Sequence, residues 1–349
     1  MGKATKDELA VVSSELKEWV LNSANVSLSD AQKQYGGGPL IEKIVCQIRA
    51  APEVNARVTR ISDSHYEYLI EIFTGLIGRL MSGFTLCALH PDFPYRKTFI
   101  EAGLPAEKAR ATLAIVLLNL ATTFVTFHEF AHLVTGHLSL LKAMGAIEAL
   151  DESPDLPFPQ EVSSLDRQTL EANADATAAI LLVGQTLSHQ DQHAQRQDMP
   201  WFKSAETSIE LMFFSIIAFF WASGVRLHDL SALDEPGYPP NTLRERMVVR
   251  AVVRYIEHRL SERRGDKTPI LKEPVLQIAV RAANVFDKCF PFAEQLPPLA
   301  DLLAQTNDAR IETHILRIGD NWQILAKRLE GLKHGGNLRT GRIIIRSTG

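Results

Sequence analysis

The sequence predicts a mainly α-helical protein with a small β-sheet, an α+β fold in which helices predominate. Apolar residues recur at helical spacing through much of the 349-residue chain. Two runs, 111–127 and 211–225, are apolar enough to form helices that are buried on all sides. The best strand candidate is 83–94, which ends at two prolines.

The first hundred residues are expected to be mostly helical. Residues 1–35 have the apolar spacing of an amphipathic helix, and the sequence YGGGP at 35–39 breaks it. The segments 40–50 and 64–82 follow as helical patterns, and 83–94 is the expected strand.

The middle of the chain is expected to consist of two helices and two loops. A helix over 105–138 has Gly136 as its C-cap, because glycine readily supplies the left-handed backbone that ends helices. The Pro-rich, acidic segment 151–165 is a loop, a second helix spans 166–183, and the polar stretch 188–200 is a loop or flap.

The C-terminal part is again expected to be helical. An aromatic-rich helix covers 204–225, a turn region covers 229–242, and a long charged amphipathic helix begins near Thr242. The segment 268–333 predicts three more helices, and the tail 334–349 contains a short strand-like stretch.

Composition excludes several classes of partner. The 37 basic and 41 acidic residues give a net charge of −4, so there is no broad basic surface for nucleic acid. The three cysteines are far apart and form no C-x-x-C pair, which indicates a reducing compartment. The N-terminus lacks the apolar core of a secretion signal. We therefore expect a cytoplasmic protein.

The sequence HEFAH, from His128 to His132, carries the strongest chemical signal. Positions i and i+4 share one helix face, so two imidazoles can bind one metal ion. Glu129 is rotated away and can act as general base on a metal-bound water, as in zinc hydrolases. The rest of this turn is apolar, and a metal would satisfy two imidazoles that are costly to bury bare. The alternative is a pair of partly buried, hydrogen-bonded histidines.

A catalytic zinc usually has three protein ligands and one open position. We expect Glu171 to be the third, because it lies on the later helix, and Asp175 shares its face one turn on. Asp175 can accept the second N–H of His128 or His132, as carboxylates do around metal-bound histidines. The small residues between and beside these carboxylates allow close approach of the two helices.

His137 is a weaker ligand candidate, because the H-E-x-x-H-x-x-G-x-x-H pattern requires Gly at 135 and His at 138. Those positions hold Thr135 and Leu138, so we interpret His137 as a capping or pocket residue. His189 and His193 lie in a polar stretch and are expected to be solvated. Residues that could stabilise an oxyanion are His137, Tyr238, His189 and His193.

These motifs together resemble the gluzincin metallopeptidases. The run EANADA from Glu171 is similar to the E-x-x-A-D segment of the HtpX and CAAX prenyl protease group. YPPNTLR, 238–244, resembles their His-Pro-Pro…Arg segment, with Tyr238 in place of His. HEFAHLVTGHL also resembles the phage-exclusion Lit-type and the ImmA-type soluble peptidases. The resemblance implies zincin-like helices beside a small sheet, a bound Zn²⁺, and a buried ion pair or a place near the active site for Arg244; a surface arginine is the alternative.

We therefore expect an N-terminal helical segment at 1–39, a zincin-like metallopeptidase core at 40–246 and a C-terminal helical region at 247–349. The expected function is zinc-dependent hydrolysis of peptide bonds in an intracellular protein, with a protein or peptide substrate and room for a regulatory protein partner. One alternative is a catalytically silent zincin-fold regulatory or binding module. The other is a membrane-embedded, HtpX-like protease, which is disfavoured because the two apolar runs fall short of about 20 residues.

Overall fold

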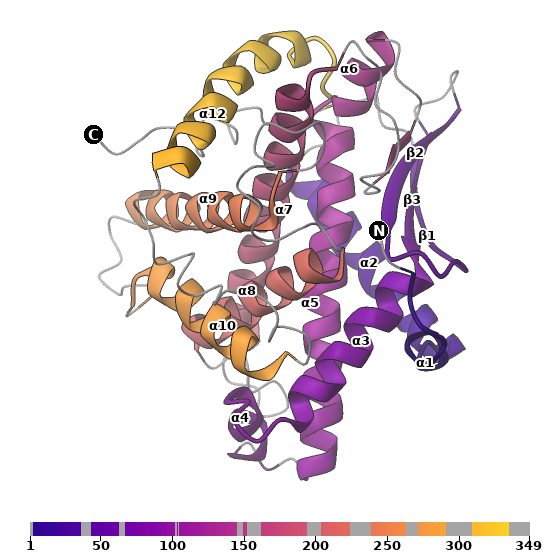
Figure 1. The fold of residues 1–349 in the computed structure, drawn as a ribbon, viewed down its shortest axis with the longest axis vertical. Coiled ribbons are helices and arrows are strands. Elements are labelled where there is room, and N and C mark those ends of the chain that lie inside the picture. The colour runs from indigo at the N-terminus through magenta and orange to yellow at the C-terminus, as the bar shows by residue number, and fades with distance from the viewer. Residues whose placement is uncertain are drawn as a thin grey trace.

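The computed structural model describes residues 3–35, 43–62, 67–101, 103, 105–144, 149–151, 162–193, 204–223, 239–262, 271, 273–290 and 309–334. Within these residues, helices surround one long central helix and a small sheet flanks it (Figure 1). The expected mainly α fold with a small sheet is confirmed.

The helices are α1 (Lys6–Ala10), α2 (Ser14–Tyr35), α3 (Thr74–Leu89), α4 (Tyr95–Glu101), α5 (Ala106–Val134), α6 (His137–Ala143), α7 (Ser164–His193), α8 (Ala205–Ala222), α9 (Asn241–Glu262), α10 (Val275–Cys289) and α12 (Ala309–Leu329). The strands are β1 (Lys43–Arg49), β2 (Ala56–Ser62), β3 (Glu67–Phe73) and β4 (Ala149–Asp151). Their order in the sheet is β1-β3-β2-β4, with β1 parallel to β3 and β2 antiparallel to both β3 and β4.

The sheet corrects two helix predictions. Residues 43–49 and 67–73, which we expected to be helical, pair as parallel strands with Cys46 opposite Ile70. In β3, Tyr68, Ile70 and Ile72 share one face of the strand and are buried, and Glu71 and Phe73 on the other face are buried as well. Each run is seven residues long, so tertiary pairing decided its conformation. The strand β2 was not expected at all.

The strand predicted at 83–94 is also wrong, because α3 continues to Leu89. The buried residues Gly83, Phe84, Cys87 and Ala88 recur at helical spacing and face the core. Gly83 is needed there, since a Cβ at this position would lie 2.5 Å from the ring of Phe290. The prolines after this segment therefore follow a helix and not a strand.

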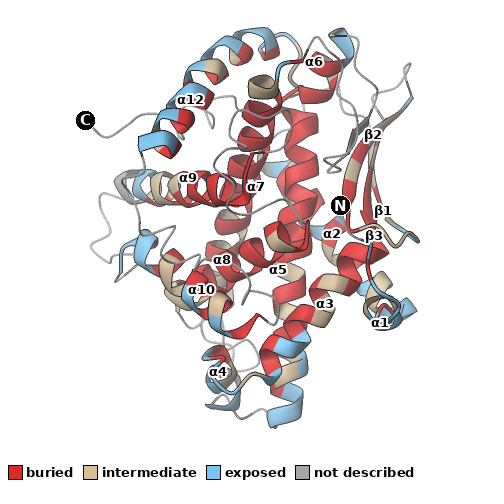
Figure 2. Ribbon diagram, in the orientation of Figure 1, coloured by how far each residue is buried: buried red, intermediate tan, exposed pale blue. Residues whose placement is uncertain are grey.

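The central helix α5 is buried continuously from Ala121 to Val134, which Figure 2 shows as an unbroken red stretch. Aromatic rings of α8 pack on it: Phe124 lies 5.6 Å from Phe219 and 5.7 Å from Phe220 between ring centroids. The helix expected at 105–138 ends at Val134. Gly136 then takes φ +83°, and a short new helix begins at His137.

The helix α7 is longer than expected. It begins at Ser164 and runs to His193, so the first part of the stretch 188–200 that we expected as a loop or flap is helical. The helices predicted at 204–225 and from Thr242 are confirmed as α8 and α9. The main hydrophobic core includes residues from Ala4 to Leu329, and α9 runs across position 246, where we placed a domain boundary.

Some predictions lie outside the described residues. They include the YGGGP break, the turn region up to Tyr238, most of the loop at 151–165, and the tail after His334. Of the three helices predicted in 268–333, the described residues contain α10 and α12.

Candidate metal centre

The candidate site forms where the C-terminal part of α5 packs against the N-terminal half of α7. His128 and His132 come from α5 and Glu171 comes from α7, and each side chain is at most 2% exposed. Among the described residues, they form the one group of three His, Cys, Asp or Glu side chains close enough to share a metal. The alanines of α7 in this region are fully buried and allow the helices to approach closely.

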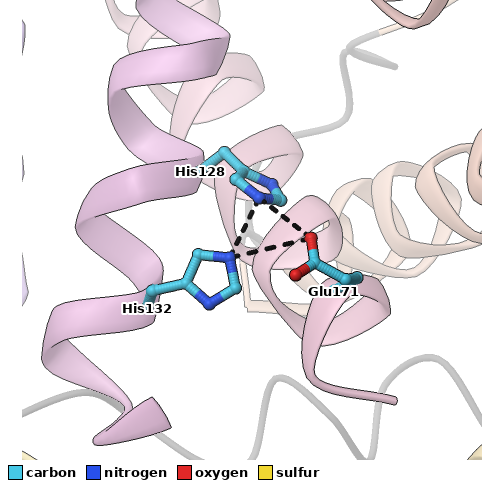
Figure 3. A group of neighbouring side chains, drawn as sticks. All are labelled: His128, His132 and Glu171. Carbon is cyan, nitrogen blue, oxygen red and sulfur yellow. Dashed lines mark hydrogen bonds and ion pairs between the residues drawn. The ribbon is translucent and has the colours of Figure 1, made fainter. Parts of the chain in front are cut away.

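The three side chains point at one another (Figure 3). The Nε2 atoms of His128 and His132 are 3.0 Å apart. Glu171 Oε2 lies 3.3 Å from Nε2 of His128 and 3.8 Å from Nε2 of His132. Ligands bound to zinc at their usual distances in a tetrahedron are separated by roughly 3.4 Å. The observed triangle therefore has the size that one zinc ion requires.

The chemistry of these three atoms favours a cation between them. When both imidazoles present lone pairs, these and the carboxylate oxygen repel one another, and burial removes the water that would screen this repulsion. Burial, then the charges of His128, His137 and Arg244, lowers the pKa of His132 well below its usual value. A neutral imidazole is the form that binds a metal. These residues fit a divalent metal ion.

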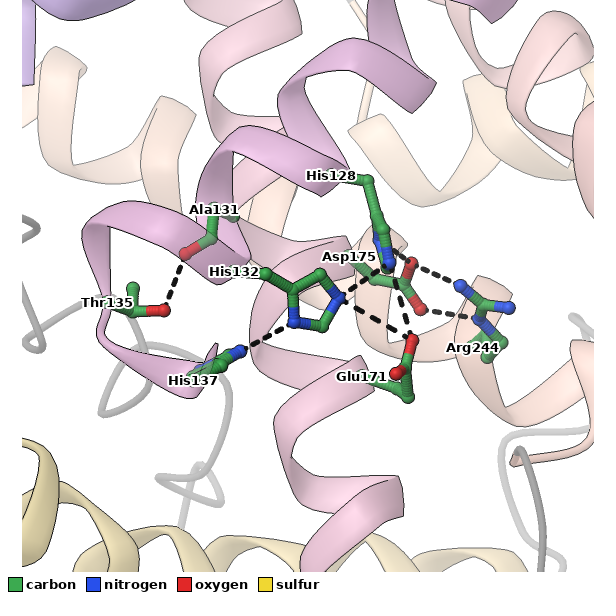
Figure 4. A network of polar contacts seen from close by, with 8 residues as sticks. All are labelled: His128, Ala131, His132, Thr135, His137, Glu171, Asp175 and Arg244. Atoms are coloured by element: carbon green, nitrogen blue, oxygen red, sulfur yellow. Dashed lines mark hydrogen bonds and ion pairs between the residues drawn. The ribbon is translucent and has the colours of Figure 1, made fainter. Parts of the chain in front are cut away.

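Asp175 holds the ring of His128 from behind. Its Oδ1 lies 3.0 Å from His128 Nδ1, the ring nitrogen that faces away from Glu171 (Figure 4). Asp175 also accepts two hydrogen bonds from Arg244, at 2.7 and 2.8 Å. Burial opposes ionisation of Asp175, but Arg244 and His128 together lower its pKa below the usual value. The carboxylate is therefore charged and accepts the Nδ1–H of His128.

Arg244 is completely buried, so the surface alternative for this arginine is wrong. Its guanidinium carbon also lies 4.6 Å from the centroid of the Phe220 ring. Phe220 was not among the expected site residues, because nothing in the local sequence relates it to Arg244. Tyr238, which we named as a residue that could stabilise an oxyanion, lies outside the described residues.

His137 contacts His132 on the side away from the other ligands. The two Nδ1 atoms are 2.8 Å apart, while Nε2 of His132 faces His128 (Figure 4). Burial, followed by the charge of His128, lowers the pKa of His137 to about 3. The side chain of Asn173 opposes this shift, although no hydrogen bond of ordinary geometry reaches His137 Nε2. His137 thus lies beside His132 on the side opposite to His128.

The remaining predicted residues differ in how well they are placed. Glu129 lies on the turn of α5 between the two histidines, and its side chain is buried, at 1% exposed. His189 belongs to the helical part of α7, 18 residues beyond Glu171, which is about 27 Å along the helix. It therefore cannot stabilise an oxyanion at this centre. His193 ends the same helix and lies still farther along it.

Two cavities of about 340 Å³ and 300 Å³ are lined by residues of α2, α5 and α7, the larger one also by α8, and both include Gln185 and His189. Neither is lined by His128, His132 or Glu171. No family model, curated protein or solved structure matches the chain. What the centre does must therefore be argued from its own residues.

Proposed function

We propose that this protein is a zinc-dependent peptidase. One observation carries the proposal: two imidazole nitrogens and one carboxylate oxygen, all buried, converge at the spacing of zinc ligands. Two histidines and one glutamate are the ligand set of a known class of catalytic zinc sites, which keep a fourth position open for water or substrate. The presence of this set supports the resemblance to gluzincin metallopeptidases.

In this proposal His128, His132 and Glu171 would hold the ion. A bound zinc supplies a water of lowered pKa and polarises a carbonyl group. Asp175 fixes the ring of His128, and Arg244 keeps Asp175 charged. Glu129 takes a proton from the water and passes it to the leaving amine. A glutamate next to the first histidine has no such task in a purely structural site.

The exposure of the site favours one alternative. His128, Glu129, His132 and Glu171 are each 1 to 2% exposed, so a polypeptide substrate reaches them only after neighbouring segments move. A catalytically silent zincin-fold module, in which the metal serves stability or partner binding, would need no such opening. Both the peptidase and the silent module require the metal, but only the peptidase requires Glu129 as a general base. Replacement of Glu129 therefore distinguishes the two functions.

The proposal is tested in two steps. Zinc titration of the purified protein should give one ion per chain, and Glu171→Ala should bind it more weakly. Failure of the unaltered protein to bind any divalent metal would overturn both functions. Glu330→Ala, an exposed glutamate on the turn after α12, is the matched control and should bind as the unaltered protein does.

The second step measures cleavage of a quenched-fluorescent peptide library. Glu129→Gln should retain zinc and lose cleavage, because the amide cannot accept the proton of the water. Full cleavage by this variant would remove Glu129 from the mechanism. Stoichiometric zinc without any cleavage by the unaltered protein would favour the silent module. The substrate we propose is an intracellular protein or peptide, and a regulatory partner would provide the opening.

A further inference from the structure

The two histidines of the metal centre have different supports. His128 Nδ1 lies 3.0 Å from the carboxylate of Asp175, whereas His132 Nδ1 lies 2.8 Å from a third imidazole, that of His137. A carboxylate can only accept a hydrogen bond here. An imidazole nitrogen donates or accepts, depending on its tautomer. The pair His132–His137 therefore has two possible proton arrangements, and the surroundings must select one.

A metal bound at this site would select the arrangement. The Nε2 of His132 lies 3.0 Å from Nε2 of His128 and 3.8 Å from the carboxylate of Glu171, so this nitrogen belongs to the metal-facing side. A metal-binding nitrogen carries no proton, and the proton of a neutral ring is then on Nδ1. His132 consequently donates through Nδ1, and the Nδ1 of His137 accepts.

We propose that His137 is a positioning residue that holds His132 in the Nδ1–H tautomer and so presents its Nε2 to the metal. This inference rests on the proposed metal function for its purpose. The proton arrangement is that of the site with a metal bound. With Nδ1 as acceptor, His137 carries its own proton on Nε2, where the buried side chain of Asn173 is its neighbour.

The fold places His137 rigidly for this role. The chain leaves α5 at Thr135, passes through Gly136 at φ +83° and starts α6 with His137 itself. The ring of His137 is completely buried, and the indole of Trp322 from α12 lies 6.4 Å away, at 76° to it. Three elements therefore fix the acceptor, as expected of a residue that orients a ligand.

The tautomers can be read from the folded, zinc-loaded protein. Two-bond ¹H–¹⁵N spectra of ¹⁵N-histidine-labelled protein distinguish Nδ1–H from Nε2–H rings. With zinc bound, we expect Nδ1–H for His128 and His132 and Nε2–H for His137. An Nε2–H ring at His132, or an Nδ1–H ring at His137, in the zinc-loaded protein would overturn the inference. This spectrum requires no substrate.

A pair of variants measures the effect on the metal. His137→Asn keeps an acceptor close to the position of Nδ1, and His137→Phe keeps a ring without one. We expect zinc affinity to fall ten- to a hundred-fold in His137→Phe, the usual effect of losing such a support, and to be largely retained in His137→Asn. Equal losses in both variants would mean that the ring acts by packing alone and would overturn the inference.

His334→Phe is the control for loss of a buried histidine. His334 lies 3.3 Å from Ser139 and 3.2 Å from the hydroxyl of Tyr68, outside the metal centre, and its replacement should leave zinc affinity unchanged. If His137→Phe does not fold, the spectrum and His137→Asn still decide. Failure of the unaltered protein to bind zinc would overturn the proposed function and this role with it. Zinc binding with an Nδ1–H ring at His137 would overturn the positioning role alone.

Discussion

At the scale of single residues, Arg244 is the cation on which the buried charge of Asp175 depends. Arg244→Met removes both hydrogen bonds to Asp175, which is itself completely buried. Breaking a buried ion pair in this way costs about 3–5 kcal/mol, because the remaining charge has lost its compensation. Urea denaturation of the variant should show this loss of unfolding free energy.

The double variant Arg244→Met with Asp175→Asn tests the cause of that loss. Removing the uncompensated charge should restore part of the free energy of unfolding, so the double variant should be more stable than Arg244→Met alone. If Arg244→Met changed stability by less than about 1 kcal/mol, the ion pair would be energetically unimportant.

The buried side chain of Glu245 should make the free energy of unfolding depend on pH. This effect does not involve the candidate metal centre. Burial, and then the charge of Asp287, raises the pKa of Glu245 well above its usual value. Neither carboxylate oxygen has a hydrogen-bond partner among the described residues. The folded protein therefore keeps a proton that the unfolded chain loses near pH 4.5, and this contribution to stability is lost as pH rises through the folded-state pKa.

Glu245→Gln removes this titration. The variant should have a higher free energy of unfolding than the unaltered protein at pH 7.5, and the difference should shrink toward pH 4.5. Urea denaturation at both pH values measures it, with the exposed Glu330→Gln as control. A difference that does not vary with pH would show that Glu245 carries no shifted pKa.

The sequence alone predicted the site residues that lie four positions apart on one helix. His128 and His132 share a helix face, and Glu171 and Asp175 share another, so two helices that meet bring all four together. The role of His137 could not be predicted, because its contact with His132 depends on the break of the helix at Gly136. Only the failed match to a longer zinc motif kept it from being taken for a ligand.

At the scale of elements, the junction between α5 and α6 depends on Gly136. Its φ of +83° is unfavourable for other residues, and an added Cβ would lie 2.7 Å from the carbonyl carbon and oxygen of Leu332. Gly103 has nearly the same φ, +87°, with no atom within 4 Å of an added Cβ. Comparing alanine variants at these two positions therefore distinguishes the cost of backbone strain from the cost of a steric clash.

Gly103→Ala should cost about 1–2 kcal/mol, the strain of a left-handed backbone alone. Gly136→Ala should cost clearly more, because the segment after α12 must move as well. Thermal or urea denaturation of both variants measures the difference. Equal losses of unfolding free energy in the two variants would mean that the segment around Leu332 moves away from the new Cβ without destabilising the protein.

The elements that were predicted incorrectly share a physical cause. In the seven-residue runs of β1 and β3, the spacing of apolar residues fits a helix as well as a strand. Only the pairing of the two runs with each other defines the strand conformation. Long helices such as α8 carry enough periodic or uniformly apolar residues to be recognised without knowledge of their neighbours. Helix ends were less certain, since α5 ends four residues before the predicted position because of Gly136.

At the scale of the whole molecule, the segment 309–334 packs over the C-terminal end of α5. His334 donates its backbone N–H to the carbonyl of Val134, and Trp322 of α12 packs near His137. His314 of α12 contacts Gln168, one turn before Glu171. The segment 309–334 thus contacts both helices of the candidate metal centre. Polar contacts of His314 and Asn321 to Asp166, Gln168 and Thr169 attach α12 to α7.

The same arrangement bears on whether the chain enters a membrane. Helices α5 and α8 are long and apolar enough to span one, but 67% and 83% of their most apolar windows are buried inside the fold. The helix α9 packs against α7 and α8 and carries many charged side chains. Because the apolar surface of α5 and α8 is mostly used for packing, we predict that the folded chain needs no lipid.

Ultracentrifugation of a detergent-free lysate tests this prediction. The protein should remain in the supernatant, and its helical circular dichroism should be unchanged by added detergent. Recovery in the membrane pellet after a carbonate wash, with release only by detergent, would instead support the membrane-embedded protease. Zinc titration of the soluble fraction then shows whether the metal centre assembles without lipid, as packing of α5 against α7 within this fold leads us to expect.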